Sequence, residues 1–414
     1  MKNRVVITGL GAITPIGTGK EAFWNALLEG KNGIGKITHF DASDYGAQIA
    51  GEVEDFDPTA YIDKKESKRM DRYAQFAVAA AKLAIEDAKL DLEAENTDRI
   101  GTYIGTGIGG IETMHASYKR LFEKGPSRIS PFFIPMMIAN LAAGQVAITY
   151  KLHGPSSCIV TACASGTNSI GDAFRLIQQG EADVMIAGGT EAAVSEAAVA
   201  GFAAMKALCM DHNDDPAHAS RPFDKNRSGF VMGEGAGLVV LESLDHAKAR
   251  GAHIYAELAG YGTNSDAYHV TSPAPGGDYQ AKCMKLALDD AGLAPAEVDY
   301  VNAHGTSTHL NDESETLAIK AIWGEAAKDV SVSSIKSMTG HLLGAAGGVE
   351  AIATVLAVAN DMLPPTMNYE TPDEGLDLDY VPNKAKAKTV RAAISNNFGF
   401  GGHNACIVMK KYAE

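Results

Sequence analysis

Short apolar runs that end in glycine loops recur along the chain. They are rich in β-branched residues, which is typical of strands buried on both faces of a helix-covered sheet. Longer segments between them repeat apolar residues at helical spacing, as in residues 71–90. This alternation predicts an α/β fold. The strands expected in the first part of the chain are residues 4–11, 99–107, 156–160, 182–189 and 237–243.

The same succession of elements returns in the second part of the chain. Its strand-and-loop segments follow the order of the first set, at residues 253–266, 298–308, 330–352, 392–402 and 404–410. Each correspondence is weak alone, because α/β proteins resemble one another locally. Five correspondences in the same order favour an internal duplication. We therefore divide the chain into an N-terminal half, residues 1–251, and a C-terminal half, residues 252–414.

Composition and charge narrow the class of protein. The chain has 414 residues and a net charge of −15, which argues against a general affinity for nucleic acid or anionic membranes. No uninterrupted apolar run reaches the roughly 18 residues that span a bilayer. The five cysteines show no zinc-like spacing, and no secretory signal begins the chain. We expect reduced thiols and a cytoplasmic protein.

One cysteine lies where a strand is expected to meet a helix, in the segment TACASGTNS, residues 161–169. A helix N-terminus would lower the pKa of the Cys163 thiol and offer N–H donors to an oxyanion. A buried, inert cysteine is an equal alternative from this segment alone. In the duplicated half, His341 takes the equivalent place. The small-faced helices after both residues could then pack together in the middle of the protein.

Two histidines and a lysine of the C-terminal half complete the candidate chemistry. His304 and His341 each follow an expected strand, where sites form in α/β proteins, although either could be structural. Lys336 is enclosed by small and apolar neighbours, so it needs a buried carboxylate partner. Glu350 and Asp312 are the two partners that the sequence suggests.

Three further segments give weaker evidence of function. Residues 211–218 gather aspartates and histidines, but their loop composition favours a solvated loop over a metal site. The GTGIGG segment at 105–110 misplaces its third glycine, and no acidic residue follows at the distance of a dinucleotide site. In NNFGFGGHN, residues 396–404, the phenylalanines supply apolar walls, and Phe400 between glycines can act as a gate.

Several motifs together resemble one family. The segments TACASGTNSIGDA, RPFDKNRSGFVMGEGAG, VNAHGTST, IKSMTGHLLGAAG and NNFGFGG resemble the elongating β-ketoacyl-[acyl carrier protein] synthases of type II fatty acid synthesis, above all the synthase II type. The resemblance covers essentially the whole chain. It implies an α/β fold of the duplicated thiolase-like kind, with five layers αβαβα, and a homodimer. It also implies an acyltransferase that needs no metal or other cofactor.

The resemblance assigns roles to particular residues. Cys163 is expected to accept the acyl group, with His304 and His341 completing a triad, and Lys336 matches an essential lysine. Phe400 matches a gate, and its backbone N–H with that of Cys163 matches an oxyanion hole. The expected substrate-binding residues are Thr306 and Thr308 for the pantetheine arm, Ile108 and Phe133 near the acyl pocket, and Phe398.

The implied reaction is a decarboxylative Claisen condensation between acyl-Cys163 and malonyl-[acyl carrier protein], which yields 3-oxoacyl-[acyl carrier protein]. The carrier protein of this family is acidic, so an enzyme of charge −15 needs a local basic face. A cluster of basic residues within 62–73 supplies such a face, although a run of charged residues is usually a solvated surface without a partner. The predicted docking residues are Lys64, Lys65, Lys68 and Arg69, with Arg128 and Lys206 added by the resemblance.

Some alternatives stay open at this stage. A synthase I-type enzyme or a type II polyketide ketosynthase would share the same catalytic residues, and a non-catalytic chain-length partner subunit would lack Cys163. A degradative thiolase is excluded, since residues 396–404 hold no second cysteine. His403 stands where the family commonly has threonine, and residues 309–311 also depart from its pattern, so the subtype is uncertain.

Overall fold

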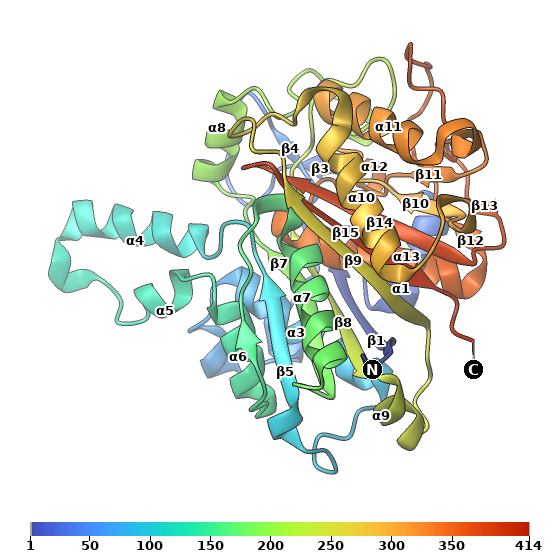
Figure 1. Ribbon diagram of the computed structural model, residues 1–414. Helices are drawn as coiled ribbons and strands as arrows, with labels where there is room; N and C mark the ends of the chain where they lie inside the picture. The colour runs from blue at the N-terminus through green and yellow to red at the C-terminus, as the bar shows by residue number, and fades with distance from the viewer. Residues whose placement is uncertain (1, 414) are drawn as a thin grey trace.

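The computed structural model describes residues 2–413 and is built around one mixed sheet (Figure 1). The strands of its first half are β1 (Val5–Thr14), β2 (Gly17–Thr18), β5 (Ile100–Gly105), β6 (Ser156–Ser157), β7 (Val184–Glu191) and β8 (Gly235–Ser243). Those of its second half are β9 (Ala256–Ser265), β10 (Tyr300–Asn302), β11 (Ser331–Ser333), β14 (Ala392–Gly399) and β15 (His403–Lys410). Two small ribbons are formed by β3 (Gly35–Lys36) with β4 (Ile49–Ala50), and by β12 (Met362–Leu363) with β13 (Lys386–Ala387).

The strand order repeats on the two sides of the sheet. From the centre outward it runs β1, β8, β7, β5, β6 on one side and β9, β15, β14, β10, β11 on the other. The two sides meet where β1 pairs with β9, and the pairings within each side have the same directions. The predicted duplication of the fold is therefore confirmed. The division predicted after residue 251 falls between α9 (Leu244–Ala249) and β9.

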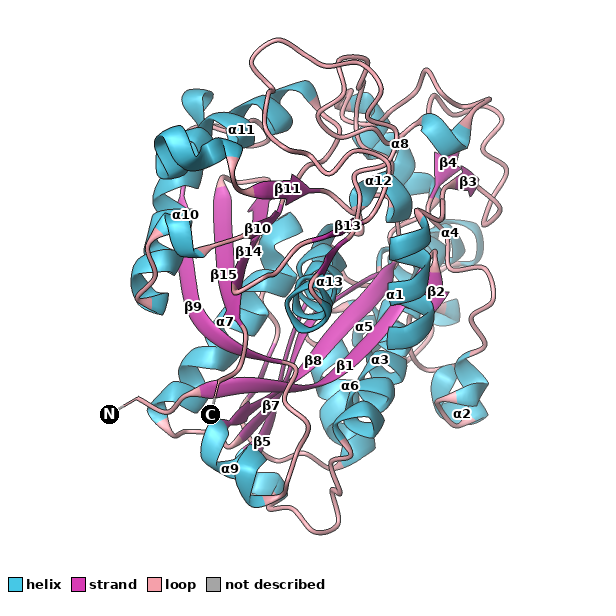
Figure 2. Ribbon diagram, turned by 90° about the vertical axis from the view of Figure 1, so that its right-hand side faces the viewer, coloured by secondary structure: helices cyan, strands magenta, loops and turns pink. Residues whose placement is uncertain are grey.

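The two sides of the sheet form two layers of the fold, and helices form the other three. α3 (Arg72–Ala88) and α6 (Leu141–Tyr150) cover the outer face of the first side, and α10 (Asp278–Ala291) and α11 (His309–Trp323) cover the second. α7 (Ser165–Gln179) and α13 (Ala346–Asn360) lie between, and Figure 2 shows α13 end-on among the strands. This is the predicted αβαβα arrangement. The remaining helices are α1 (Lys20–Glu29), α2 (Lys64–Ser67), α4 (Ile111–Lys124), α5 (Phe133–Met137), α8 (Glu196–Ala204) and α12 (Lys336–Thr339).

The central helix is as apolar as a membrane span. Residues 343–360 have a mean hydropathy of 1.5 and are long and apolar enough to cross a membrane, although glycines and Glu350 interrupt the apolar run. However, 89% of this segment is buried inside the protein. Its hydropathy therefore reflects a position in the core between the two sides of the sheet.

Glycines allow the two central helices to approach each other closely. A side-chain carbon on Gly347 of α13 would lie 2.2 Å from the Thr167 hydroxyl oxygen on α7. One on Gly348 would lie 2.0 Å from the carbonyl oxygen of Gly237 on β8. Since neither position has room for a larger residue, the N-terminal ends of α7 and α13 are held together beneath one cavity.

An arm made of α4 and α5 projects from the body of the protein (Figure 1). None of the described side chains of either helix is buried. Phe122 is 83% exposed, and Tyr118 and Ile134 are also exposed. Such apolar exposure is unusual for an isolated chain and indicates a contact surface.

Candidate active site

Cys163 lies on a short 3₁₀ turn, Ala162–Ala164, that leads directly into α7. Ala162 adopts a left-handed conformation with φ of 51°, which is strained for a residue other than glycine. The Ser165 side chain braces the turn, because it accepts a hydrogen bond from the Thr161 N–H at 2.9 Å and donates one to the Ala162 carbonyl at 2.6 Å. Strain held by such contacts is typical of a functional position.

The second half carries a matching turn, Leu343–Ala345, at the start of α13. Leu343 repeats the left-handed conformation of Ala162, with φ of 50°. Gly344 is therefore the counterpart of Cys163, and the predicted equivalence of Cys163 with His341 is wrong by three residues. His341 belongs to the preceding segment, where its N–H donates to the carbonyl of Val231 at 2.7 Å.

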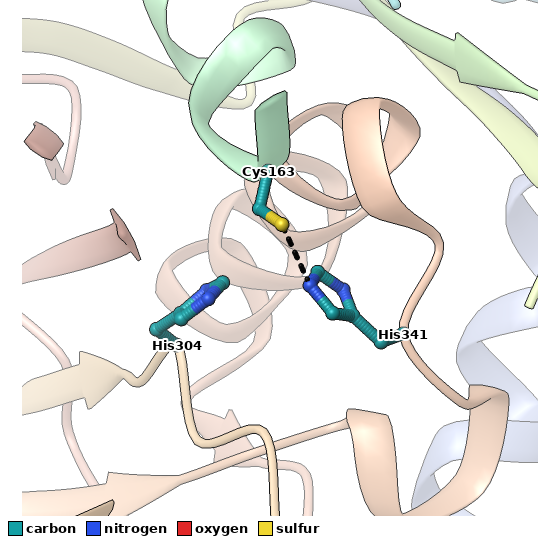
Figure 3. Close-up of side chains that lie close together, drawn as sticks. All are labelled: Cys163, His304 and His341. Carbon is teal, nitrogen blue, oxygen red and sulfur yellow. Dashed lines mark hydrogen bonds between the residues drawn. The ribbon is translucent and has the colours of Figure 1, made fainter. Parts of the chain in front are cut away.

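The side chains of Cys163, His304 and His341 nevertheless converge (Figure 3). His341 Nε2 lies 3.0 Å from Cys163 Sγ, and the His304 and His341 rings are 5.2 Å apart at 84°. Each histidine is 2% exposed and Cys163 is 8% exposed. The structure thus brings together the three residues that the sequence proposed as a triad.

Hydrogen bonds fix the tautomer of both imidazoles. The N–H of Leu343 donates to His341 Nδ1 at 3.3 Å, and Asn397 Nδ2 lies 3.4 Å from His304 Nδ1. Asn397 Nδ2 also donates to Glu350 at 2.7 Å, so it is a donor toward His304 as well. Both Nδ1 atoms are acceptors, and each neutral ring therefore carries its proton on Nε2.

A buried ion pair sets the charge of the site. Lys336 pairs with Glu350, one of its two predicted partners, whereas Asp312 lies 3.6 Å from Arg227. Burial first, and the Lys336 charge second, hold the pKa of His304 and His341 well below 6.5. Both imidazoles are consequently neutral at physiological pH and can donate through Nε2.

The predicted lowering of the Cys163 pKa is wrong. Burial raises the pKa of this thiol to about 12, while the Lys336 charge and the backbone N–H of Phe400 act in the opposite direction. Desolvation of a thiolate outweighs the favourable field of the helix end. The resting site therefore holds a neutral thiol beside neutral imidazoles.

The backbone N–H of Phe400 faces the Cys163 sulfur. Besides the Phe400 N–H, the Cys163 N–H lies 3.1 Å from the point that a side-chain carbon on Gly399 would occupy. Only a glycine at 399 lets the β14 end come this close. The two amides thus lie on adjoining segments, and the oxyanion hole expected from Cys163 and Phe400 stays a prediction.

Sequence reasoning missed two positioning residues. Glu315 on α11 accepts hydrogen bonds from the N–H groups of His304 and Gly305, both at 2.8 Å. Asn397 on β14 links His304 to Glu350. The signal for Glu315 was weak, since polar residues on a helix usually face solvent, and its burial depends on packing that the helical pattern does not reveal.

A cavity of about 310 Å³ opens above Cys163. Of the expected substrate-binding residues it is lined by Thr306, Thr308 and Phe398, and Phe400 also lines it. The Thr306 and Thr308 hydroxyls lie 2.9 Å apart. Ile108 and Phe133 are not among the lining residues: Ile108 is 36% exposed, and Phe133 begins α5 on the projecting arm.

The predicted docking residues lie in three places. Lys64, Lys65 and Lys68 are exposed on and after α2, and Arg128 is exposed beyond α4. Arg69 pairs with Glu66 at 3.0 Å. Lys206 lines the cavity with His309 and Leu310, two of the residues that depart from the family pattern, whereas His403 begins β15.

Removing Lys336 should destabilise the fold through its partner. In Lys336→Met the Glu350 carboxylate is left buried without its cation, which should lower the free energy of unfolding by about 3–5 kcal/mol. The double variant Lys336→Met/Glu350→Gln should recover most of this loss. Guanidinium denaturation followed by circular dichroism measures both, and equal losses in the two variants would contradict a destabilising unpaired carboxylate.

Comparison with known proteins agrees with this geometry. The family model for the β-ketoacyl synthase N-terminal domain matches residues 2–247, and that for the C-terminal domain matches residues 255–370. A 3-oxoacyl-[acyl-carrier-protein] synthase 2 of Synechocystis is 57% identical, with 99% of both chains covered. One of Staphylococcus aureus is 54% identical, covering 99% of this chain and 98% of that protein.

Among solved structures, a type II polyketide ketosynthase in complex with its acyl-carrier protein superposes with a TM-score of 0.93. It is 37% identical, and the match covers all of both chains. Family models that together span most of the chain, relatives above 50% identity and this shared structure lead to one conclusion. The chain belongs to the β-ketoacyl synthase family.

Proposed function

We propose that this chain catalyses the decarboxylative condensation of an acyl thioester with malonyl-[acyl carrier protein] in fatty acid elongation, giving 3-oxoacyl-[acyl carrier protein]. The observation that carries the proposal is the cysteine beside two neutral imidazoles at the base of one cavity, with Cys163 Sγ 3.0 Å from His341 Nε2. The relatives named 3-oxoacyl-[acyl-carrier-protein] synthase 2 support the same reaction.

The first half-reaction loads Cys163. Its sulfur attacks the carbonyl carbon of the acyl-carrier thioester, and the N–H groups of Cys163 and Phe400 stabilise the developing oxyanion. The tetrahedral intermediate expels the carrier thiol, which leaves with the proton of the Cys163 thiol. Since the raised pKa of Cys163 keeps the resting sulfur protonated, this proton is transferred during the attack and not before it.

The second half-reaction uses the histidines as donors. The Nε2–H groups of His304 and His341 bond to the malonyl thioester oxygen, which becomes negative as the carboxylate leaves as CO₂. The carbon freed by decarboxylation attacks acyl-Cys163 and displaces the cysteine sulfur, which then takes up a proton. Lys336 acts through the imidazoles: its charge adds to burial in keeping both neutral, and Glu350 ties it to Asn397 and His304.

Intact mass spectrometry tests the nucleophile directly. Incubation with an acyl-[acyl carrier protein] should add the acyl mass to one site, which peptide mapping should place at Cys163. Cys163→Ala should accept no acyl group, whereas Cys406→Ala, which removes a buried cysteine of β15, should load normally. Loading of the Cys163→Ala protein, or no adduct with any donor, would refute the proposal.

A second candidate function is the type II polyketide condensation performed by the ketosynthase of similar structure. An enzyme with that function would use the same catalytic residues, so the two candidates differ in the acyl group that they accept and in its chain length. Competition between saturated acyl-carrier donors of increasing length and a polyketide intermediate distinguishes them. A chain-length partner subunit without activity is disfavoured by the presence of Cys163.

The active enzyme is a homodimer in this proposal. β6 lies at one edge of the sheet, and the neighbouring Ile148 and Val160 are 69% and 54% exposed. An unpaired edge strand beside apolar side chains favours pairing with another chain. A partner seated here would also cover the apolar arm, which supports a place for Phe133 of the arm near an acyl pocket.

Sedimentation equilibrium should therefore give twice the chain mass of 43.5 kDa. Ile148→Lys with Val160→Lys should shift the protein toward the single chain, since two charges would be desolvated in the interface. Leu286→Lys on α10, an exposed apolar residue of the opposite outer layer, is the matched control. A wild-type protein that sediments as one chain would contradict the dimer.

The acidic carrier protein docks on the basic residues in this proposal. Lys65 is exposed beside the N-terminus of α2, and the Arg69 guanidinium lies 4.9 Å from the Phe132 ring of the arm. Lys206 lines the cavity into which a pantetheine arm must pass. A type II ketosynthase of similar structure has been solved with its carrier protein, which supports this class of partner.

Charge reversal separates docking from chemistry. Lys65→Glu/Arg69→Glu should raise the KM for carrier-bound acyl groups by about tenfold and spare small thioesters that lack the carrier. Lys282→Glu/Lys285→Glu on α10 makes the same change of four charge units at two exposed sites and is the control. Equal effects on both kinds of substrate would count against docking at these residues.

The five free cysteines support the further proposal of a cytoplasmic location.

A further inference from the structure

A second group of metal-ligating side chains lies in the loop that follows α8. The chain turns back on itself there, so that Cys209, Asp211 and His212 place one ligand atom each within 4.8 Å of the others. The condensation chemistry does not use these residues. We propose that they bind a borderline-soft divalent cation of the Zn²⁺ class.

The distances between the donor atoms carry this proposal. Cys209 Sγ lies 3.4 Å from Asp211 Oδ1 and 3.8 Å from His212 Nδ1, and the latter two atoms are 2.9 Å apart. Tetrahedral Zn²⁺, with bonds of about 2.3 Å to sulfur and about 2.0 Å to nitrogen and oxygen, separates its ligand atoms by about 3.3–3.6 Å. Each separation needs to change by only a few tenths of an ångström to receive the ion.

The surroundings hold two of the ligands in place. The Cys209 N–H donates to the carbonyl of Phe230 at 2.9 Å, which anchors the cysteine to a neighbouring segment. The Ser228 hydroxyl donates to Asp211 Oδ1 at 2.6 Å and orients the carboxylate. A polar group that positions a ligand in this way raises metal affinity, because less order is lost on binding.

The ligand types decide the class of cation. Ca²⁺ and Mg²⁺ take oxygen ligands, whereas a set of sulfur, nitrogen and oxygen suits Zn²⁺ and similar ions. Cys209 is 1% exposed, while the Asp211 and His212 side chains are 61% and 23% exposed. Three protein ligands with an outer side toward solvent leave a fourth position for water.

The rest of the loop stays outside this site. Asp214 lies 3.5 Å from Lys36, and Asp215 pairs with His218 at 2.9 Å. These residues lie in a solvated loop, as predicted for residues 211–218. The proposed site instead combines two residues of that segment with Cys209, which the sequence did not associate with it.

A cation bound here would stiffen one wall of the catalytic cavity. Ser228 and Phe230 line that cavity, and the Phe230 ring lies 5.3 Å from the His341 ring, edge to face. The ion would join the turn at residues 209–212 to this wall. It would not touch the reacting atoms, so the site is independent of the proposed condensation.

Cobalt titration tests the site through a thiolate-specific signal. Cys163, His304 and His341 also bring ligand atoms within 4.8 Å of one another, so the measurement is made on full-length, EDTA-treated Cys163→Ser protein. Added Co²⁺ should produce thiolate-to-cobalt charge-transfer absorption that saturates at one ion per chain, and Zn²⁺ should abolish it. Further loss of Cys209, in Cys163→Ser/Cys209→Ser, should remove the absorption.

Two further variants complete the test. In the same Cys163→Ser background, His212→Gln should weaken Co²⁺ binding by more than about tenfold, as expected for loss of one ligand. Cys158→Ser, which removes a thiol elsewhere, should change nothing. No charge-transfer absorption in the Cys163→Ser protein, absorption that survives Cys209→Ser, or an affinity unchanged by His212→Gln would each overturn the proposal. Circular dichroism establishes that each variant is folded.

Discussion

The close contact between α7 and α13 is the constraint on which the site depends. Gly347 lies against Thr167, and Gly348 lies against the backbone of β8, so a larger residue at either position would push α13 away from its neighbours. The 3₁₀ turns at the starts of both helices are therefore brought to one point. Cys163 lies on one turn, and His341 lies just before the other.

The site also requires a positive charge that is buried and held in a fixed position. Lys336 and Glu350 satisfy each other in the core, at a desolvation cost that a pair of apolar residues would avoid. The charge is retained where it lowers the pKa of two imidazoles and keeps them as hydrogen-bond donors without a charge of their own. Stability and reaction chemistry are thus joined through one ion pair.

Much of the fold was predictable because its strands are buried on both faces. Such runs remain apolar throughout, and their order along the chain revealed the duplication. The partner of Lys336 was also within reach, since few carboxylates follow it on a helix. The segments that hold β6, β10 and β11 were predicted as well, but only the pairing in the sheet shows how short these strands are.

Other features of the site depended on tertiary packing. Cys163 and His341 seemed equivalent because small residues follow both, but the left-handed residues Ala162 and Leu343 set the true register. The sign of the Cys163 pKa shift was wrong because a helix end can be inferred locally, whereas burial of the sulfur cannot. Ile108 and Phe133 do not line the cavity above Cys163, and their place near an acyl pocket stays a prediction.

The chemistry of this site depends on two imidazoles that act as neutral hydrogen-bond donors. The most direct measurement of this is the pH dependence of malonyl-[acyl carrier protein] decarboxylation by the Cys163→Ala protein, which lacks the competing acylation step. The rate should stay constant from about pH 8 to about pH 6, because the pKa of His304 and His341 lies well below the usual value near 6.5. A one-proton transition centred near pH 6.5 would contradict the account, since it would show that an imidazole of ordinary pKa controls the reaction.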